Sequence, residues 1–214
     1  MRAAILAVAL VVASGVGAQQ QEPVEVPAPR LQVDDTWEYE IVDLWKGSPL
    51  SRQLARVIDV QGDTAVILFE SQRVDEERPR KRGVSVDTRT LTEFNPVQPA
   101  YFFLGFPLQP GKTWQFDFIN QAQGRATNKV ERWAKVVGWE TVSVPAGTFR
   151  ALRVEMKDRR LWQAGDGVFP DHWYTTVWYV PEVKRFVRLE REHRAADSKR
   201  WSYQATILKS YSLK

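Results

Sequence analysis

The stretch VSVPAGTFRALRVE, residues 142–155, places a turn between two runs of alternating apolar residues. Pro145 has its φ fixed at about −65°, which suits the second position of a turn. Gly147 can adopt the positive φ that joins a turn to a twisted strand. The stretch has no nucleophile or general base, and a single glycine without a following helix does not bind phosphate. It therefore predicts a β-hairpin and no catalytic loop.

The same alternation of apolar and polar residues continues on both sides of this hairpin. It is clearest in residues 37–41, 114–118 and 201–207. Gly62 lies between two further runs and predicts another hairpin, and Pro181 predicts another corner. Helical periodicity is nearly absent after residue 31. The pattern predicts an all-β protein with few or no helices, built as a curved antiparallel sheet or half-barrel with one face in water.

The first residues are typical of a targeting segment. Arg2 precedes an apolar run of about 14 residues that is too short to span a bilayer, and small residues at positions 16–18 fit a cleavage site. We expect a signal peptide over 1–18, a flexible Pro- and Gln-rich leader over 19–30 and a single β domain over 31–214. The mature chain is expected to be periplasmic or secreted and to have no transmembrane segment.

Cysteine and charge usage narrow the possible chemistry. The absence of cysteine excludes disulfides, thiolate metal sites and acylation of a bacterial lipoprotein cysteine. The 30 Lys and Arg are interleaved with 26 Asp and Glu, which indicates an ordinary soluble surface. A basic cluster, residues 78–82, predicts a solvated hairpin tip, with phosphate headgroups as the alternative partner. We expect no nucleic-acid partner, because stacking aromatics beside the cluster are missing.

Residues suited to catalysis are few. His193 lies in a charged strand end and is expected to be solvated. Asp166, Asp171 and His172 form either a polar loop or, less favoured, a divalent cation site, because their spacing matches no ligand motif. The adjacent carboxylates of Asp34–Asp35 point to opposite faces of a strand, which is poor geometry for acid–base work. The sequence therefore predicts a non-enzyme without metal or cofactor.

Two aromatic segments are candidate ligand-binding regions. The loop at 101–109 is rich in aromatic residues, prolines and glycine, and either packs into the core or forms the mobile rim of an apolar pocket. Residues 162–173 combine glycines with aromatic side chains in the same way. The candidate contacts in both segments are Tyr101, Phe102, Phe103, Phe106, Trp162, Phe169 and Trp173.

Three pieces together resemble a group of uncharacterised bacterial envelope proteins: VSVPAGTFRALRVE, TTVWYVPEVKRFVRLE at 175–190, and a closing alternating strand. The group shares the VPAGTF hairpin and a Trp-Tyr-x-Pro corner. Many members carry Gly-Val-Gly after the corner proline, where this chain has Glu182-Val183-Lys184. The group is similar in fold to the half-barrels of the lipoprotein-localisation factors LolA and LolB, whose curved sheet holds acyl chains. The shared motifs are turn and core residues, so the resemblance implies a fold and no catalytic residue.

Fold analogy and aromatic content together favour a non-catalytic protein that binds an apolar or amphipathic envelope ligand, such as a lipid or lipoprotein. The alternative is an interaction module without a pocket, which docks on another envelope protein through its sheet edge or its aromatic loops. A pocket and an aromatic core need the same residue types. Composition and pattern therefore leave both hypotheses open.

Overall fold

The chain folds as a single antiparallel β-sheet. The computed structural model describes residues 25–93, 97–98, 103–120, 128–164, 167–195 and 199–214, and of residues 97–98, 120, 162–164 and 167–169 only the backbone. Within these residues the only helical element is a short 3₁₀ turn, η1, at Pro181–Val183. No helix in them is long and apolar enough to cross a membrane. The all-β prediction is confirmed.

Twelve strands of the described residues make up the sheet, and most belong to long hairpins whose apolar positions alternate with polar ones. Their bounds are β1 Thr36–Asp43, β2 Ser48–Gln61, β3 Thr64–Arg73, β4 Arg80–Asp87, β5 Thr92–Glu93, β6 Val97–Gln98, β7 Thr113–Asn120, β8 Asn128–Val144, β9 Gly147–Ala164, β10 Gly167–Val180, β11 Arg185–Arg194 and β12 Arg200–Ser212.

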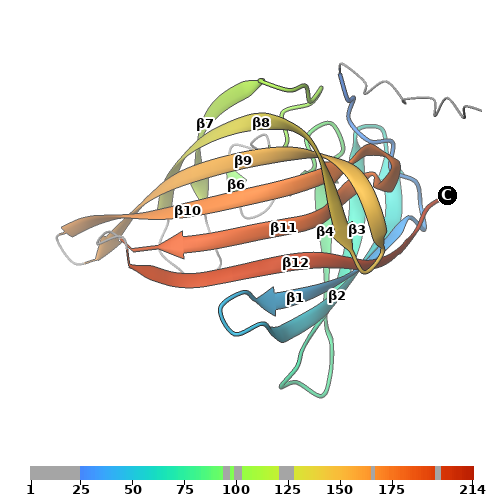
Figure 1. Cartoon of the computed structure of the whole chain (residues 1–214), viewed down its shortest axis with the longest axis horizontal. Helices are drawn as coiled ribbons and strands as arrows, with labels where there is room; N and C mark the ends of the chain where they lie inside the picture. The colour runs from blue at the N-terminus through green and yellow to red at the C-terminus, as the bar shows by residue number, and fades with distance from the viewer. Residues whose placement is uncertain (1–24, 94–96, 99–102, 121–127, 165–166, 196–198) are drawn as a thin grey trace, which may run out of the picture.

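Two meanders meet in the middle of this sheet. The strand order is β5-β4-β3-β2-β1-β12-β11-β10-β9-β8-β7-β6, and every neighbouring pair is antiparallel. The first meander runs from β1 outward to β5, and the second returns from β6 to β12, which pairs with β1. Figure 1 shows the resulting curvature: β3 and β4 run steeply across the direction of β9–β12.

The two edges of the sheet lie close together in space. Strand β5 ends at Glu93 and β6 begins at Val97, yet the two strands stand at opposite ends of the strand order. Four peptide links span at most about 15 Å. The sheet must therefore bend round until its edges approach each other, so it has a concave inner face and a convex outer face.

The turns lie where the sequence predicts them. Strands β8 and β9 are joined by Pro145 and Ala146, and Gly147 has a φ of 142°. Gly62, with a φ of 57°, lies in the turn between β2 and β3. Pro181 opens η1, which ends at Lys184 in the left-handed conformation. Turn chemistry is local, which is why the sequence specifies these positions without tertiary information.

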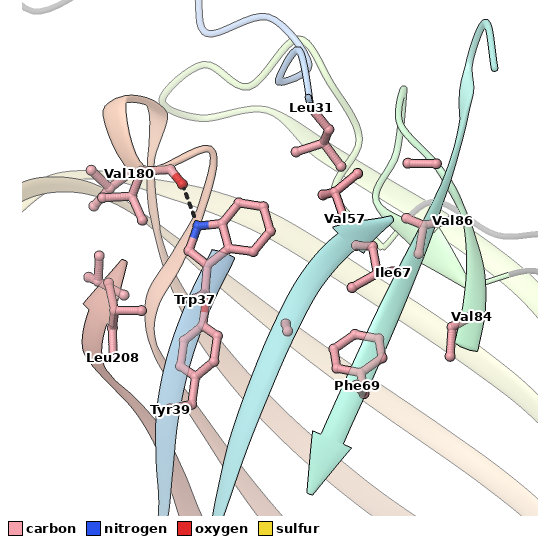
Figure 2. Close-up of a cluster of buried hydrophobic side chains, with 14 of the residues drawn as sticks. Leu31, Trp37, Tyr39, Val57, Ile67, Phe69, Val84, Val86, Val180 and Leu208 are labelled. Carbon is pink, nitrogen blue, oxygen red and sulfur yellow. Dashed lines mark hydrogen bonds between the residues drawn. The ribbon is translucent and has the colours of Figure 1, made fainter. Parts of the chain in front are cut away.

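Much of the inner face is filled by a first core cluster from β1–β4 and the corner between β10 and β11. Trp37, Tyr39, Ile67 and Phe69 lie together in it (Figure 2). The Trp37 indole Nε1 donates to the Val183 carbonyl at 2.8 Å, and the Tyr39 hydroxyl donates to the Phe186 carbonyl at 2.9 Å. These bonds attach the first strand of one meander to a corner of the other.

A second core cluster fills the inner face of β8–β11, and two strand-free segments cover it. Val26 pairs with Leu108 through two backbone hydrogen bonds of 2.8 Å, and both side chains are buried in this cluster together with Leu104. Val26 belongs to the segment that composition predicts to be a flexible leader. The Val26 side chain nevertheless packs in the same core cluster as Leu108, and the leader as a whole stays a prediction.

Candidate functional site

The aromatic loop was expected either to pack into the core or to form a pocket rim, and its described part, residues 103–109, packs against the core. Phe103 and Phe106 are partly buried against the second core cluster, and the Phe106 ring packs edge-on against Tyr179 at 5.3 Å. Leu104 between them is fully buried. Tyr101 and Phe102 lie outside the described residues, as do the side chains of Trp162 and Phe169.

Trp173 lies on the inner face of β10, where it takes part in a buried polar cluster. Its ring stacks on the His193 imidazole, with centroids 4.2 Å apart and planes 8° from parallel. The Trp201 ring meets the same imidazole edge-on at 5.1 Å. His193 is buried, so the prediction of a solvated histidine is wrong. Because His193 pairs opposite Trp173 in the register, the Trp173 ring covers the imidazole.

The polar cluster is held together by charge-assisted hydrogen bonds. His193 Nε2 lies 2.9 Å from Asp171 Oδ2, and Arg160 binds both oxygens of the same carboxylate. On the neighbouring strand pair, β8 and β9, Arg132 donates to both oxygens of Asp158 at 2.7 and 2.6 Å. Bidentate Arg–carboxylate pairs fix geometry as well as charge. The cluster therefore supports the inner face of β8–β11.

The residues proposed as a cation site are not brought together. Asp171 points inward to Arg160 and His193, whereas His172 points to the outer face, where its ring lies 6.5 Å from that of Tyr174. Asp166 lies outside the described residues. Among the residues that are described, no group of three His, Asp or Glu side chains could hold a metal ion.

The cleft that stands out lies on the outer face, where sequence analysis did not predict one. Its volume is about 800 Å³, and three consecutive residues from each of β7, β8, β9 and β10 line it. The middle residues Ala134, Met156 and Thr175 are buried on the core side, while their neighbours are exposed or half-buried. Because side chains alternate between faces, the cleft lies among the outward side chains. These are Thr113, Gln115, Trp133, Lys135, Glu155, Lys157, Tyr174 and Thr176.

Aromatic rings and cations dominate this outer cleft. Trp133 is 39% exposed, so part of its apolar ring is open to solvent. Lys157 pairs opposite Trp133 in the register, and its ammonium lies 5.9 Å from the centre of the Tyr174 ring. Glu155, the one carboxylate among the lining side chains, is ion paired with Arg153. The lining thus combines apolar surface with net positive charge.

His172 borders the cleft through Tyr174. Burial lowers the pKa of its imidazole, and the positive charge of Lys157 lowers the pKa further. The Asp171 carboxylate opposes this change, while Arg159 adds to it. The imidazole is therefore sensitive to any change of charge at Lys157.

One sequence signal for the cleft exists but is weak. Trp133-Ala134-Lys135 and Glu155-Met156-Lys157 both place a small or apolar residue between two outward positions. Only the register, which sets Trp133 against Lys157 and Lys135 against Glu155, shows that the two segments share one surface. That pairing joins residues 20 and 24 positions apart, so alternation alone does not predict it.

The comparisons with known proteins concern the fold. A family model described as "Protein of unknown function (DUF3108)" matches residues 31–193. A crystal structure of a candidate lipoprotein from Parabacteroides distasonis is 13% identical, with a TM-score of 0.54, over 87% of this chain and 99% of that one. A candidate exported protein with a YmcC-like fold from Bacteroides fragilis is 12% identical, with a TM-score of 0.53, over the same shares. Among curated proteins none matches.

Proposed function

The chain belongs to the DUF3108 family, and on that premise we propose that it is a non-catalytic binding protein of the bacterial cell envelope whose amphipathic ligand occupies the outer cleft. One observation carries the proposal: a cleft of about 800 Å³ that combines an exposed indole, a phenol ring and two ammonium groups. Clefts of this size are typical of small-molecule sites, which are mostly apolar with a few placed polar groups.

Exposed apolar surface in the cleft favours a ligand with an apolar part. The Trp133 ring offers a large flat face, and burying it would contribute about 25 cal/mol for each Å² removed from water. The threonine and glutamine side chains at the cleft border can hydrogen-bond a polar part. Such a mixed lining suits an amphipathic molecule better than a purely apolar one.

The envelope location is supported by two independent observations. The first 18 residues have the composition of a secretory signal peptide. Two solved structures of similar fold are described as those of a lipoprotein candidate and an exported protein candidate. The similarity to the lipoprotein-localisation half-barrels remains a hypothesis, as does any lipoprotein cargo.

The alternative function, docking of another protein on a sheet edge, has less support. Strands β5 and β6 at the two edges are two residues long, and short edges are poor templates for strand addition. The basic hairpin tip is also largely self-neutralised, because Arg80, Lys81 and Arg82 are ion paired with Glu76, Glu70 and Glu93. The outer cleft therefore remains the better candidate.

Native mass spectrometry tests the proposal on residues 19–214 purified from a bacterial envelope without detergent. We expect an added small-molecule mass, and Trp133→Ala should lower the ratio of bound to free protein at least about tenfold, the equivalent of about 1.4 kcal/mol. Trp45→Ala is the matched control, because Trp45 is at least as open, at 48% exposure, but lies in the turn between β1 and β2. A clean apo mass, or equal loss in both variants, would contradict the proposal.

A further inference from the structure

The two lysines of the outer cleft differ from the other cations around them. Neither Lys135 nor Lys157 has an ion-pair partner within the described residues, and the Lys157 ammonium lies over the Tyr174 ring. Five other cations on the same face of β8–β11 are paired with carboxylates, and they are Lys129, Arg153, Arg159, Arg188 and Arg194. Unpaired positive charge is thus concentrated at the cleft.

Register brings the two ammonium groups within reach of one anion. Lys135 pairs with Glu155, and Trp133 pairs with Lys157, so the two lysines occupy diagonal positions on one face of adjacent strands. Diagonal neighbours in an antiparallel pair are about 7–8 Å apart at the backbone. Long, flexible lysine side chains easily close that gap on a shared anion.

Glu155, the carboxylate in the cleft lining, is not ion paired with either lysine. Glu155 is held by Arg153 on its own strand, two positions away, and the same guanidinium also contacts Glu140. The Arg153 charge therefore offsets the negative charge of Glu155. Lys135 and Lys157 are left as the cationic part of the lining, one two positions from Trp133 on β8 and the other opposite Trp133 on β9.

We propose that the outer cleft takes a single-chain anionic amphiphile, with a phosphate or carboxylate head between Lys135 and Lys157 and its apolar chain against Trp133. This inference rests on the proposed function and adds the charge and the orientation of the ligand. Two charge-assisted hydrogen bonds orient the head, while the indole buries the chain. Neither contact alone selects for an amphiphile, but their spacing within one cleft selects for both ends of the molecule.

Binding titrations on residues 19–214 test the ligand class with defined probes below their micelle concentration. The probes are lysophosphatidylglycerol, zwitterionic lysophosphatidylcholine, uncharged dodecyl maltoside and glycerol phosphate. We expect lysophosphatidylglycerol to bind at least about tenfold more tightly than each of the others, because only it offers both a net charge and a chain. Tight binding of glycerol phosphate alone would overturn the role of the apolar chain.

Lysine variants locate the head. Lys135→Gln and Lys157→Gln should each weaken lysophosphatidylglycerol binding by about tenfold, because each removes one charge-assisted hydrogen bond. Lys129→Gln is the matched control on the same face of β8, since Lys129 is already paired with Asp117 and Glu131. All three positions are exposed, so thermal midpoints near that of the parent chain would show that the variants fold.

Imidazole NMR gives an independent readout, because the chain has only two histidines. An anion beside Lys157 should offset the charge that depresses the His172 pKa, so lysophosphatidylglycerol should raise that pKa. His193, on the inner face, should not respond. An unchanged His172 pKa in the saturated complex would overturn the placement of the head.

The possible failures are distinguishable. Equal affinity for lysophosphatidylcholine and dodecyl maltoside, with no effect of either lysine variant, would overturn the anionic head and leave an amphiphile-binding cleft. Loss of binding with all four probes, or binding that Trp133→Ala does not weaken, would overturn the proposed function together with this inference.

Discussion

At the scale of single residues, Asp171 and His172 illustrate how a strand separates neighbours in the chain. The Asp171 carboxylate faces the core and bonds to Arg160 and His193, whereas the His172 imidazole faces the outer surface next to Tyr174. Successive side chains of a strand point to opposite faces, so adjacent polar residues seldom act together. The two side chains therefore lie in different environments: Asp171 in a buried ion-pair cluster and His172 at the border of a cleft.

Stability should depend on the protonation of His172. Its pKa in the folded protein is below the unfolded value of about 6.5. The unfolded chain therefore takes up the proton first, and stability is lost as pH falls from about 6.5 through the folded pKa. Urea unfolding between pH 8 and 5 should show this loss in the parent chain and a smaller one in His172→Gln. Parallel curves for the two proteins would contradict the assignment.

At the scale of elements, the hairpin of β8 and β9 dominates the second meander. Its turn has only Pro145 and Ala146 between the strands, and the backbone returns into the ladder through Gly147 at a φ of 142°. Ser143 and Thr148 close the first side-chain pair across the turn at 2.9 Å. The hairpin extends far enough to supply both the core face of the second cluster and the outward lining of the cleft.

Gly147→Val should destabilise the protein by about 1–3 kcal/mol, because a β-branched residue at this φ is strained. Space is not the cause, since an added Cβ would come no nearer than 3.4 Å to the Phe149 ring. Gly83→Val is the control: Gly83 lies in β4 without a positive φ, and nothing lies within 4 Å of its added Cβ. Equilibrium urea unfolding measures both, and an unchanged midpoint for Gly147→Val would refute the turn geometry.

At the scale of the whole molecule, Asp35 joins three distant parts of the chain. Its fully buried carboxylate accepts hydrogen bonds from the backbone N–H of Gln32 at 2.8 Å, the Lys184 ammonium at 2.8 Å and the backbone N–H of Lys214 at 2.9 Å. The start of β1, the η1 corner and the end of the chain therefore meet at one side chain. Because β1 and β12 pair where the two meanders join, this contact stabilises the whole sheet.

Asp35→Asn should lower the free energy of unfolding by about 3 kcal/mol or more, because it leaves the Lys184 charge without its partner in a largely buried site. Asp34→Asn is the matched control. Asp34 is exposed and has a φ of 72°, a conformation that asparagine accepts well, so little change is expected. Urea unfolding compares the two, and equal midpoints would show that Asp35 has no special role.

The extent of prediction from sequence differs between the fold and the site. The hairpin turns at Gly62 and Gly147 were predictable because turn chemistry is local. Residues 201–207 were predictable as a strand, but burial differs within their apolar set: Ala205 is fully buried, whereas Trp201 is 58% exposed. A period of two identifies a strand and its two faces, but it does not say which face is buried.

The sequence by itself determined the all-β class, the principal hairpins and the absence of thiol chemistry, because these follow from residue types and their local spacing. Only the tertiary structure decided that the described part of the aromatic loop packs into the core, that His193 is buried and that Trp133, Lys135 and Lys157 share an outer cleft. Each of these depends on contacts between segments that are distant in sequence, and such contacts are fixed only when the whole sheet packs on its core.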